Sequence, residues 1–357
     1  MSRPFVAFHF GLVQDVAVLR PLVLLARSLP SLDLEILITD NFHRLDEDGL
    51  WFGELKRLGA EVGVQPFTYQ SPFDCLRHFR QRRGMIIAGS ESNVVAHQHA
   101  HNLFRSVPGN IRTVTLQHGF ECLGFLHNAR HDAAIGRDIR FSADIIVGWF
   151  AERHLHALPL NERNKLFIAG PPVMIDAPTA VDEVDYHELP GLICENLHSI
   201  RFGNSRLRES FIDTFLAFAE RVGSVDQQLL LRAHPAGRFT ERNRLTLPAN
   251  VNVSRAPLYD IDLSTFAYAV SAPSTILFDF VVAKVPVSVW VDLDGDVDTS
   301  NFPGLPTVAT VEDLWHFNWM ARWHRQFLLD RQENFLTELG IPQDVKARYI
   351  QLFSLAL

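Results

Sequence analysis

Ionisable side chains follow one of the short apolar runs of this sequence. The run 113–116 is followed by the segment QHGFE, in which His118 and Glu121 carry the ionisable groups. The glycine permits a tight turn, so His118 is expected at the carboxyl end of a strand. An imidazole there can accept a proton or donate to a phosphate near neutral pH, and Glu121 can act as a general base. A histidine that only satisfies the turn is the structural alternative.

Basic residues follow a second apolar run, 229–233. Arg232 lies at its end, and His234 and Pro235 come next. Proline cannot continue a strand ladder, so we expect the strand to stop with His234 at its tip. Arg232 and Arg238 flank this histidine and would form a phosphate pocket through charge-assisted hydrogen bonds. A solvated surface turn is the alternative.

Hydroxyl residues follow a third run, 268–270. Ser271 comes first, and Ser274 and Thr275 follow a proline, which is typical of a helix start. Backbone N–H groups and hydroxyls at such a position bind anions, whereas ordinary capping is the structural alternative. Together with the His-Pro turn, this pattern predicts a phosphate-binding edge.

A single carboxylate ends a fourth run. Glu195 follows residues 191–194 within the segment CENLH. A carboxylate at a strand end can serve as a nucleophile or a base, and a hydrogen-bonding role in a linker is the alternative.

Apolar runs and helical patterns alternate along the whole chain. Strands are predicted over residues 4–10, 34–39, 85–88, 113–116, 144–147, 166–169, 191–194, 229–233, 251–253, 268–270 and 285–291, and helices over 15–27, 51–58 and 205–222. Short apolar strands separated by helices indicate parallel sheets that are covered on both faces. The rhythm restarts after the acidic, proline-bearing stretch 176–190. We therefore predict an α/β fold with two Rossmann-like lobes, whose ligands lie outside the carboxyl ends of the strands.

The predicted organisation has three parts. Residues 1–175 form a first lobe, residues 176–310 a second lobe, and residues 311–357 C-terminal helices. These helices carry tryptophans four residues apart, at 315, 319 and 323. One interpretation is a helix that packs across the two lobes, and another is an interfacial helix that touches a membrane.

Composition narrows the class of protein. The chain has 357 residues, 47% of them apolar, and a net charge of −8, so a nucleic-acid partner is not expected. Three widely spaced cysteines fit a reducing compartment. The N-terminal segment lacks the pattern of a signal peptide, and no run of about 20 apolar residues is present. We expect a cytoplasmic protein, with peripheral contact to the inner membrane as a further interpretation.

The motifs QHG, HP and S-x-x-S/T-x-x-x-x-D before K-x-P resemble those of the CDP-glycerol glycerophosphotransferases of teichoic-acid synthesis. The HP motif and the Ser/Thr pair are similar also to bacterial sialyl- and polysialyltransferases and capsular Kdo transferases, which use CMP-sugars. The resemblance covers roughly residues 110–290. It implies a GT-B fold with two lobes across a cleft. It also implies that His118 belongs to the acceptor lobe, that His234 binds the donor phosphate, and that Ser274 and Thr275 cradle it.

Two positions depart from the glycerophosphotransferases. Those enzymes have Trp before His-Gly and Asp after the first serine of the third motif, where this chain has Gln117 and Ala272. We therefore expect transfer of a Kdo- or sialic-acid-like sugar from a cytidine nucleotide to a surface polysaccharide or lipid-linked glycan. The alternatives are transfer from CDP-glycerol, a nucleotide-sugar 2-epimerase, and a non-catalytic scaffold subunit. The predicted catalytic residues are His118, Glu121 and Glu195.

No metal or other cofactor is expected, because side chains can neutralise a leaving phosphate. Two segments have a metal-like composition, residues 97–101 with three histidines and residues 292–298 with four aspartates. If residues 92–104 form a helix, only His97 and His101 share a face, and no acidic or thiol residue is adjacent. The acidic segment lacks the glycine and glutamate positions of an EF-hand loop, so we interpret it as a turn.

Overall fold

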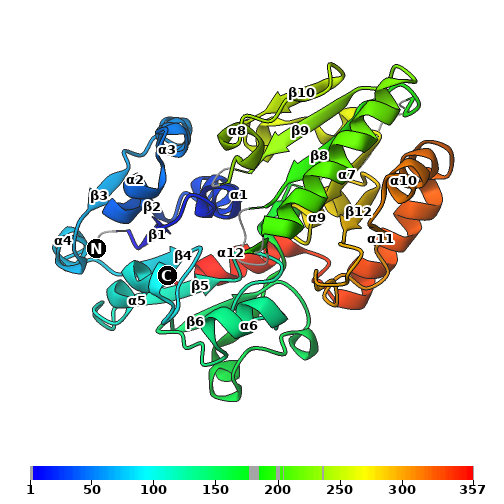
Figure 1. The fold of residues 1–357 in the computed structure, drawn as a ribbon. Coiled ribbons are helices and arrows are strands. Elements are labelled where there is room, and N and C mark those ends of the chain that lie inside the picture. The colour runs from blue at the N-terminus through cyan, green and yellow to red at the C-terminus, as the bar shows by residue number, and fades with distance from the viewer. Residues whose placement is uncertain (1–2, 177–184, 198–201, 204, 235–236, 357) are drawn as a thin grey trace. The chain divides into compact units, whose positions relative to one another are not determined.

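The computed structural model describes residues 3–176, 185–197, 202–203, 205–234 and 237–356. The chain forms two compact units (Figure 1). Unit 1 comprises Met1–His127, Ile135–Asp176 and Gly340–Leu357, and unit 2 comprises Asn128–Ala134 and Ala177–Leu339. The C-terminal segment 311–357 is therefore divided between the two units.

Unit 1 is built on a parallel seven-stranded sheet in the order β3-β2-β1-β4-β5-β6-β7. Its strands are β1 (Phe5–Phe10), β2 (Asp33–Thr39), β3 (Phe67–Tyr69), β4 (Gly84–Ala88), β5 (Ile111–Leu116), β6 (Ile145–Gly148) and β7 (Leu166–Ile168). Its α-helices are α1 (Asp15–Arg27), α2 (Asp40–Leu45), α3 (Leu50–Val62), α4 (Pro72–His78), α5 (Gln98–Phe104) and α12 (Val345–Ser354).

Both faces of the unit 1 sheet are buried. Successive residues of a strand point to opposite faces, so Phe5 and Ala7 of β1 join the cluster formed with α4 and α5. Phe8 points the other way, and its ring lies 6.1 Å from that of Phe353 on α12. The near-continuous apolar sequence of β1 follows from this two-sided burial.

Unit 2 is built on a parallel six-stranded sheet in the order β10-β9-β8-β11-β12-β13. Its strands are β8 (Gly191–Glu195), β9 (Leu229–Ala233), β10 (Val251–Ser254), β11 (Tyr268–Ser271), β12 (Val287–Trp290) and β13 (Thr307–Val308). Its helices are α6 (Ala129–Ile135, whose last residue falls in unit 1), α7 (Ser205–Gly223), α8 (Phe239–Arg242), α9 (Ile276–Val282), α10 (Val311–Trp323) and α11 (Arg325–Leu339).

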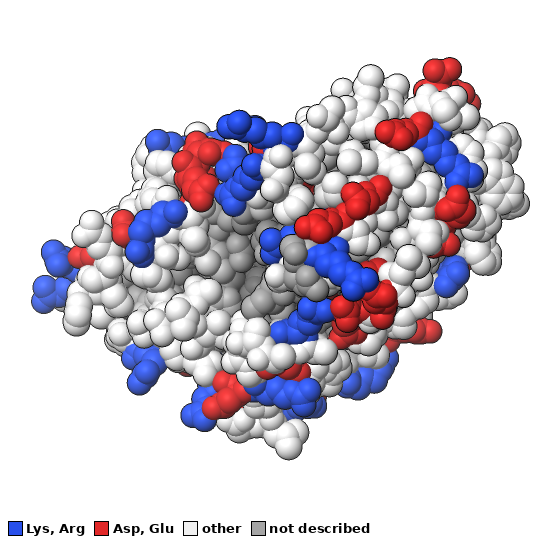
Figure 2. Space-filling view, viewed as in Figure 1, with Lys and Arg blue, Asp and Glu red and all other residues white. Residues whose placement is uncertain are grey.

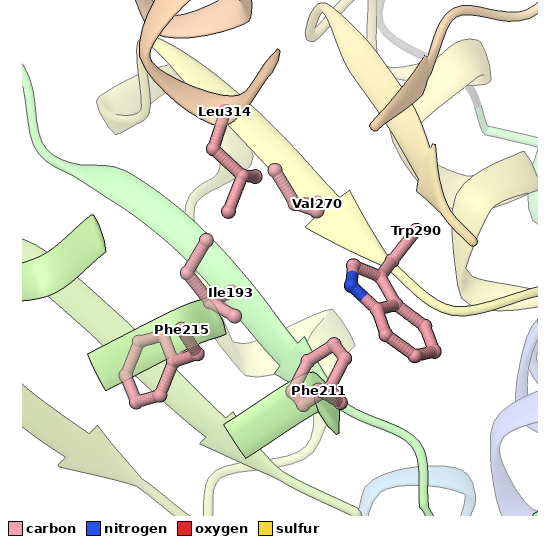
Figure 3. A pocket seen from close by; sticks show the side chains of 6 residues that line it. All are labelled: Ile193, Phe211, Phe215, Val270, Trp290 and Leu314. Atoms are coloured by element: carbon pink, nitrogen blue, oxygen red, sulfur yellow. The ribbon is translucent and has the colours of Figure 1, made fainter. Parts of the chain in front are cut away.

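One face of the unit 2 sheet packs against α7 and α10 and leaves a small apolar cavity there (Figure 3). The residues that line it come from the sheet, α7 and α10: Ile193, Val270, Trp290, Phe211, Phe215 and Leu314. Its volume is about 10 Å³, which is room for about one water molecule. Because its lining is apolar, the cavity is a packing gap in the core rather than a place for a polar ligand.

The predicted α/β fold with two parallel-sheet lobes is confirmed. The helix predicted over residues 15–27 has those bounds, and the helix predicted over 205–222 extends one residue further. Strands β3 and β13 were not predicted, because two or three residues are too few to show a period.

The tryptophans of α10 divide between core and surface. Trp315 packs against the unit 2 core, whereas Trp319 is 44% and Trp323 is 61% exposed.

No helix among the described residues is long and apolar enough to cross a bilayer. Figure 2 shows acidic and basic side chains interspersed on the face in view, without a surface of one sign.

Candidate functional site

The order of the unit 2 strands places a switch point between β8 and β11. From β8 the chain proceeds to β9 and β10 on one side, and then returns to β11 on the other side of β8. In open parallel sheets, ligands bind outside the carboxyl ends of the strands at such a point. Four of the predicted site residues, Arg232, His234, Ser271 and Glu195, lie at this edge.

Three side chains lie in a row on one face of the sheet at this edge. Cys194 of β8 pairs with Arg232 of β9 and with Ser271 of β11. Residues in register on parallel strands point to the same face, so these three side chains lie side by side. Helix α9 lies against β11 and β12, and its Asp279 acts electrostatically on both Cys194 and Arg232.

Arg232 is a buried cation that is only partly compensated. Its side chain is 7% exposed, and Nε has no hydrogen-bond partner among the described residues. Burial lowers the pKa of Arg232, and the charge of Asp279 opposes that effect. Burial also raises the pKa of Asp279 to about 7, although Arg232 lowers it. A carboxyl that is only partly ionised leaves this edge suited to a further anion.

Two other polar atoms at the same edge are buried without a partner in the described part of the chain. They are Ser271 Oγ and Asn196 Oδ1. The side-chain nitrogen of Asn196 donates to the carbonyl of Pro273 at 3.4 Å. Since buried polar groups are nearly always hydrogen-bonded in native proteins, a site with several such atoms indicates ordered water or a ligand.

His234 directly follows β9. The backbone N–H of Gly237 donates to the carbonyl of His234 at 3.1 Å. Arg238 adopts a left-handed conformation, with φ +49°, at the start of α8. Non-glycine residues in this conformation cluster at ligand sites. Pro235 lies outside the described residues.

Glu195 points away from the Arg232 row. Its carboxylate accepts hydrogen bonds from the backbone N–H groups of Phe239 and Thr240, the latter at 2.9 Å. Burial raises its pKa, and these hydrogen bonds oppose the change. The side chain is 1% exposed. Both oxygens therefore hold the first turn of α8, and the loop after β9 is anchored by this contact.

Ser274 and Thr275 stand immediately before α9, which is seven residues long. Ser274 Oγ accepts from the backbone N–H of Ile276 at 3.5 Å. Both side chains are partly buried. The structure thus brings Arg232, His234, Ser271, Ser274 and Thr275 to the carboxyl edge of one sheet.

In unit 1, Gln117 fixes the loop that carries His118. It is fully buried, its Nε2 donates to the carbonyl of Phe120 at 3.0 Å, and its Oε1 accepts from the N–H of Trp149 at 3.0 Å. The residue that departs from the glycerophosphotransferase motif therefore has a structural function here. It ties the ends of β5 and β6 together.

His118 lies in a cluster of buried and half-buried polar side chains. Its Nδ1 is 3.2 Å from Cys122 Sγ, and its ring meets the ring of His97 edge to face at 5.4 Å. Nδ1 of His97 is in turn 2.7 Å from Ser92 Oγ. Burial lowers the pKa of His97 to about 4, so it is neutral at physiological pH. Glu121, 7% exposed, follows in the same loop.

A second buried carboxylate, which was not predicted from the sequence, lies at the switch point between β1 and β4. Asp15 accepts hydrogen bonds from the N–H groups of Gly11 (2.9 Å) and Leu12 (2.8 Å) and from Ser90 Oγ (2.9 Å). Burial raises its pKa to about 6. A Cβ at Gly89 would lie 2.5 Å from Asp15 Oδ1, so this contact requires glycine.

The histidine-rich segment differs from the expectation in one respect. We expected no acidic residue beside it, but Glu91, from the loop after β4, lies 2.6 Å from Nδ1 of His101. Glu91 also accepts from the N–H groups of Ser142 and Ala143. Glu91 and His101 are ten positions apart in the sequence, so this contact could not be predicted from neighbouring positions. Among the described residues, no group of three ligands suited to a metal ion is found.

The carboxylates of the acidic segment 292–298 contact backbone N–H groups and arginine side chains. Asp292 accepts from the N–H groups of Asp296 and Val297, and Asp294 pairs with Arg206 at 3.0 Å. These contacts agree with its interpretation as a turn.

Comparisons with known proteins support the fold. No protein-family model matches the chain, and no curated protein matches it. Among solved structures, the UDP-GlcNAc 2-epimerase of Methanocaldococcus jannaschii with UDP-GlcNAc and UDP has a TM-score of 0.62 at 10% identity, over 98% of this chain and 99% of that one. A glycotransferase of kitacinnamycin has a TM-score of 0.57 at 13% identity, over the full length of both chains. The wall teichoic acid polymerase TagF with CDPG has a TM-score of 0.61 at 10% identity, over 99% and 88%.

These structures and the two parallel sheets define the class of the fold. The chain has the two-lobed α/β architecture known as GT-B. At 10–13% identity the likeness extends to the fold alone.

Proposed function

We propose that this protein is a glycosyltransferase that uses a nucleotide-activated sugar and that unit 2 binds the donor phosphate. The observation that carries the proposal is the buried Arg232 at the switch point, beside buried polar atoms of Ser271 and Asn196 that have no partner in the described structure. A buried guanidinium with incomplete compensation favours an anion, and its planar donors match a phosphate.

The other donor-binding residues surround this group along the sheet edge. His234, the residue after β9, donates a hydrogen bond to the phosphate, and Pro235 follows it in the sequence. Ser274 and Thr275 supply hydroxyls from the segment before α9. These preorganised donors neutralise the leaving phosphate without a metal ion.

Unit 1 binds the acceptor and activates its hydroxyl. His118 and Glu121, on the loop after β5, are the candidates for the general base. Glu195, which the sequence also suggested as catalytic, is better explained as the anchor of α8, because both of its oxygens accept backbone hydrogen bonds.

The donor that we favour is a cytidine nucleotide carrying a Kdo- or sialic-acid-like sugar, and the acceptor is a surface polysaccharide or a lipid-linked glycan. The motif resemblance supports this choice, as does the likeness to TagF with CDPG. CDP-glycerol is an alternative donor, because the same motifs resemble those of the glycerophosphotransferases, and it is included in the assay.

The test is release of nucleotide from CMP-, CDP- and UDP-linked donors, with and without a glycan acceptor, in the presence of EDTA. We expect acceptor-dependent release from a cytidine-linked donor that EDTA does not reduce. Loss of release on chelation, restored by magnesium or manganese, would refute the phosphate site proposed above. An inactive protein that binds no nucleotide would instead favour a scaffold subunit.

A second candidate is a nucleotide-sugar 2-epimerase. It is favoured by the full-length likeness to UDP-GlcNAc 2-epimerases, including that of Neisseria meningitidis bound to UDP-GlcNAc (TM-score 0.58, 12% identity, 98% of this chain and 100% of that one). Asp15, whose pKa lies near 6, is a carboxyl suited to proton transfer. An epimerase needs no acceptor, so conversion of UDP-GlcNAc in its absence would select this function.

A further inference from the structure

The two polar atoms of the Asn196 side chain differ in their bonding. This residue directly follows β8 and is buried. Its Nδ2 donates to the carbonyl of Pro273 at 3.4 Å, whereas its Oδ1 is buried and has no partner among the described residues. A carbonyl only accepts hydrogen bonds, so the amide nitrogen must face Pro273 and the oxygen points in another direction. The unsatisfied atom of Asn196 is therefore an acceptor.

The contact with Pro273 places Asn196 at the edge that carries Arg232. Cys194 pairs with Ser271 between β8 and β11, and Asn196 and Pro273 each come two residues later. Their hydrogen bond shows that the two segments stay side by side beyond the ends of the strands. Asn196 thus lies just outside the carboxyl edge of the sheet, at the switch point where a ligand is expected.

The neighbouring donors at this edge leave Asn196 unsatisfied. Ser271 and Arg232 both carry hydrogens, but Ser271 Oγ and Arg232 Nε are themselves buried without a partner in the described part of the chain. A fully ionised phosphate accepts hydrogen bonds, so it can satisfy Arg232 and Ser271 but not the oxygen of Asn196. Since a buried acceptor without a partner is costly, this edge favours a ligand that supplies an anion and a hydrogen-bond donor together.

From this geometry we infer that Asn196 is a specificity-determining residue, whose Oδ1 accepts a hydrogen bond from a hydroxyl group of the ligand that binds at Arg232. That this ligand is a nucleotide-activated sugar rests on the proposed function. Such a donor carries hydroxyl groups on both sides of its phosphate, on the ribose and on the transferred sugar. A site that holds a hydroxyl through a buried acceptor disfavours a ligand that lacks it, because the acceptor is then left unpaired.

The test is calorimetric titration at pH 8 of CMP, 2′-deoxy-CMP, 3′-deoxy-CMP and CMP-sialic acid into wild type, Asn196→Leu and Asn243→Leu. At this pH the phosphate of CMP is ionised and has no hydrogen of its own to donate. Leucine keeps the branched shape of asparagine and removes both polar atoms. Asn243 is the matched control, because it lies in the same unit, its Nδ2 also donates to a backbone carbonyl, and it is exposed.

The two sources of the hydroxyl give different results. If the ribose supplies it, Asn196→Leu should bind CMP about 3- to 10-fold more weakly than wild type. One deoxynucleotide should then show the same loss with wild type and no further loss with the variant. If the transferred sugar supplies it, only CMP-sialic acid should be weakened. Asn243→Leu should bind every ligand as wild type does. Should Asn196→Leu weaken neither CMP nor CMP-sialic acid while wild type binds CMP, the inference is overturned and the proposed function stands.

The stability of the ligand-free protein separates the inference from the proposed function. Both variants lose one amide hydrogen bond to a carbonyl, and removal of an unpaired Oδ1 from Asn196 adds no further loss. We expect the midpoint of urea denaturation of Asn196→Leu to be no lower than that of Asn243→Leu. A clearly lower midpoint would mean that Oδ1 is bonded without ligand, which overturns the inference. If the midpoint is as expected but wild type binds no cytidine nucleotide, the proposed donor fails and the role of Asn196 as an acceptor stands.

Discussion

At the scale of single residues, the informative feature is a buried polar atom that has no hydrogen-bond partner among the described residues. Arg232 is 7% exposed, yet its Nε has no partner among the described residues. Glu195, at the same sheet edge, is fully engaged by α8. Both residues were candidate site residues in the sequence, since both end a strand. Their hydrogen bonds separate a candidate ligand group from a structural one.

Glu121→Gln tests the carboxylate that remains as a candidate base. The substitution keeps the shape of the side chain and removes its charge. We expect turnover to fall by about 10²-fold while nucleotide affinity stays near wild type, because the loss affects proton transfer and not donor binding. Steady-state kinetics and calorimetric titration measure the two quantities. Glu220→Gln, an exposed glutamate on α7, serves as the control, and normal turnover in Glu121→Gln would leave His118 as the base.

His97 makes a pH-dependent contribution to stability. Its pKa is about 4 in the folded protein and 6.5 when unperturbed. Its contribution is therefore fully present above pH 6.5 and is lost as the pH falls toward 4, by about 3 kcal/mol in total. His97→Asn should lose that much less free energy of unfolding than wild type between pH 7.5 and pH 4, as measured by urea denaturation.

The comparison between variants is needed because His9, Asp15 and Asp279 titrate in the same range. His316→Asn, at an exposed position, should keep the wild-type pH dependence. Parallel curves for wild type and His97→Asn would mean that folding does not lower the pKa of His97.

At the scale of elements, the positions of the strand ends could be predicted from the sequence. The hydrogen-bond partners of the residues near those ends could not. The apolar runs located β5, β8, β9 and β11 within one or two residues, and hence the edges on which His118 and Arg232 lie. The sequence signal for Asp15 was its position, since it begins the helix that comes after β1 and Gly11. Its bond to Ser90, 75 residues away, depends on strand order, which no local pattern encodes.

Helix α8 provides a test of the structural role of Glu195. Glutamine retains one oxygen that can accept from Phe239 or Thr240, but its amide nitrogen would face a backbone donor. We expect Glu195→Gln to destabilise the protein by about 1–3 kcal/mol. The midpoint of urea denaturation measures this change. Native stability combined with a large loss of turnover would return Glu195 to the catalytic residues.

The cavity between the unit 2 sheet and its helices predicts how that core responds to truncation. Leu314 of α10 lines the cavity and is 3% exposed (Figure 3). Leu314→Ala should cost about 2–5 kcal/mol, because it enlarges an existing void. Leu293→Ala, at a position 77% exposed, is the matched control and should change stability by less than about 0.5 kcal/mol. Equal denaturation midpoints for the two variants would show that the core collapses around the gap.

At the scale of the whole molecule, each unit is a parallel sheet with its own switch point, between β1 and β4 and between β8 and β11. The restart of the strand–helix rhythm near residue 190 predicted two such units. It did not predict that Asn128–Ala134 joins unit 2 or that Gly340–Leu357 returns to unit 1. Those exchanges depend on side-chain contacts such as Arg130 with Asp296, and on the packing of α12 against α1.

The most direct test of the central claim is calorimetric titration of CMP, CDP, UDP and GDP into wild type, Arg232→Met and Arg244→Met. Arg244 is an exposed arginine of the same unit and should behave as wild type. We predict that a cytidine nucleotide binds wild type and that Arg232→Met weakens its affinity about 10- to 150-fold. That range corresponds to the loss of a charged hydrogen bond of about 1.5–3 kcal/mol. Unchanged affinity in a folded Arg232→Met, or no binding of any nucleotide to wild type, would contradict the account.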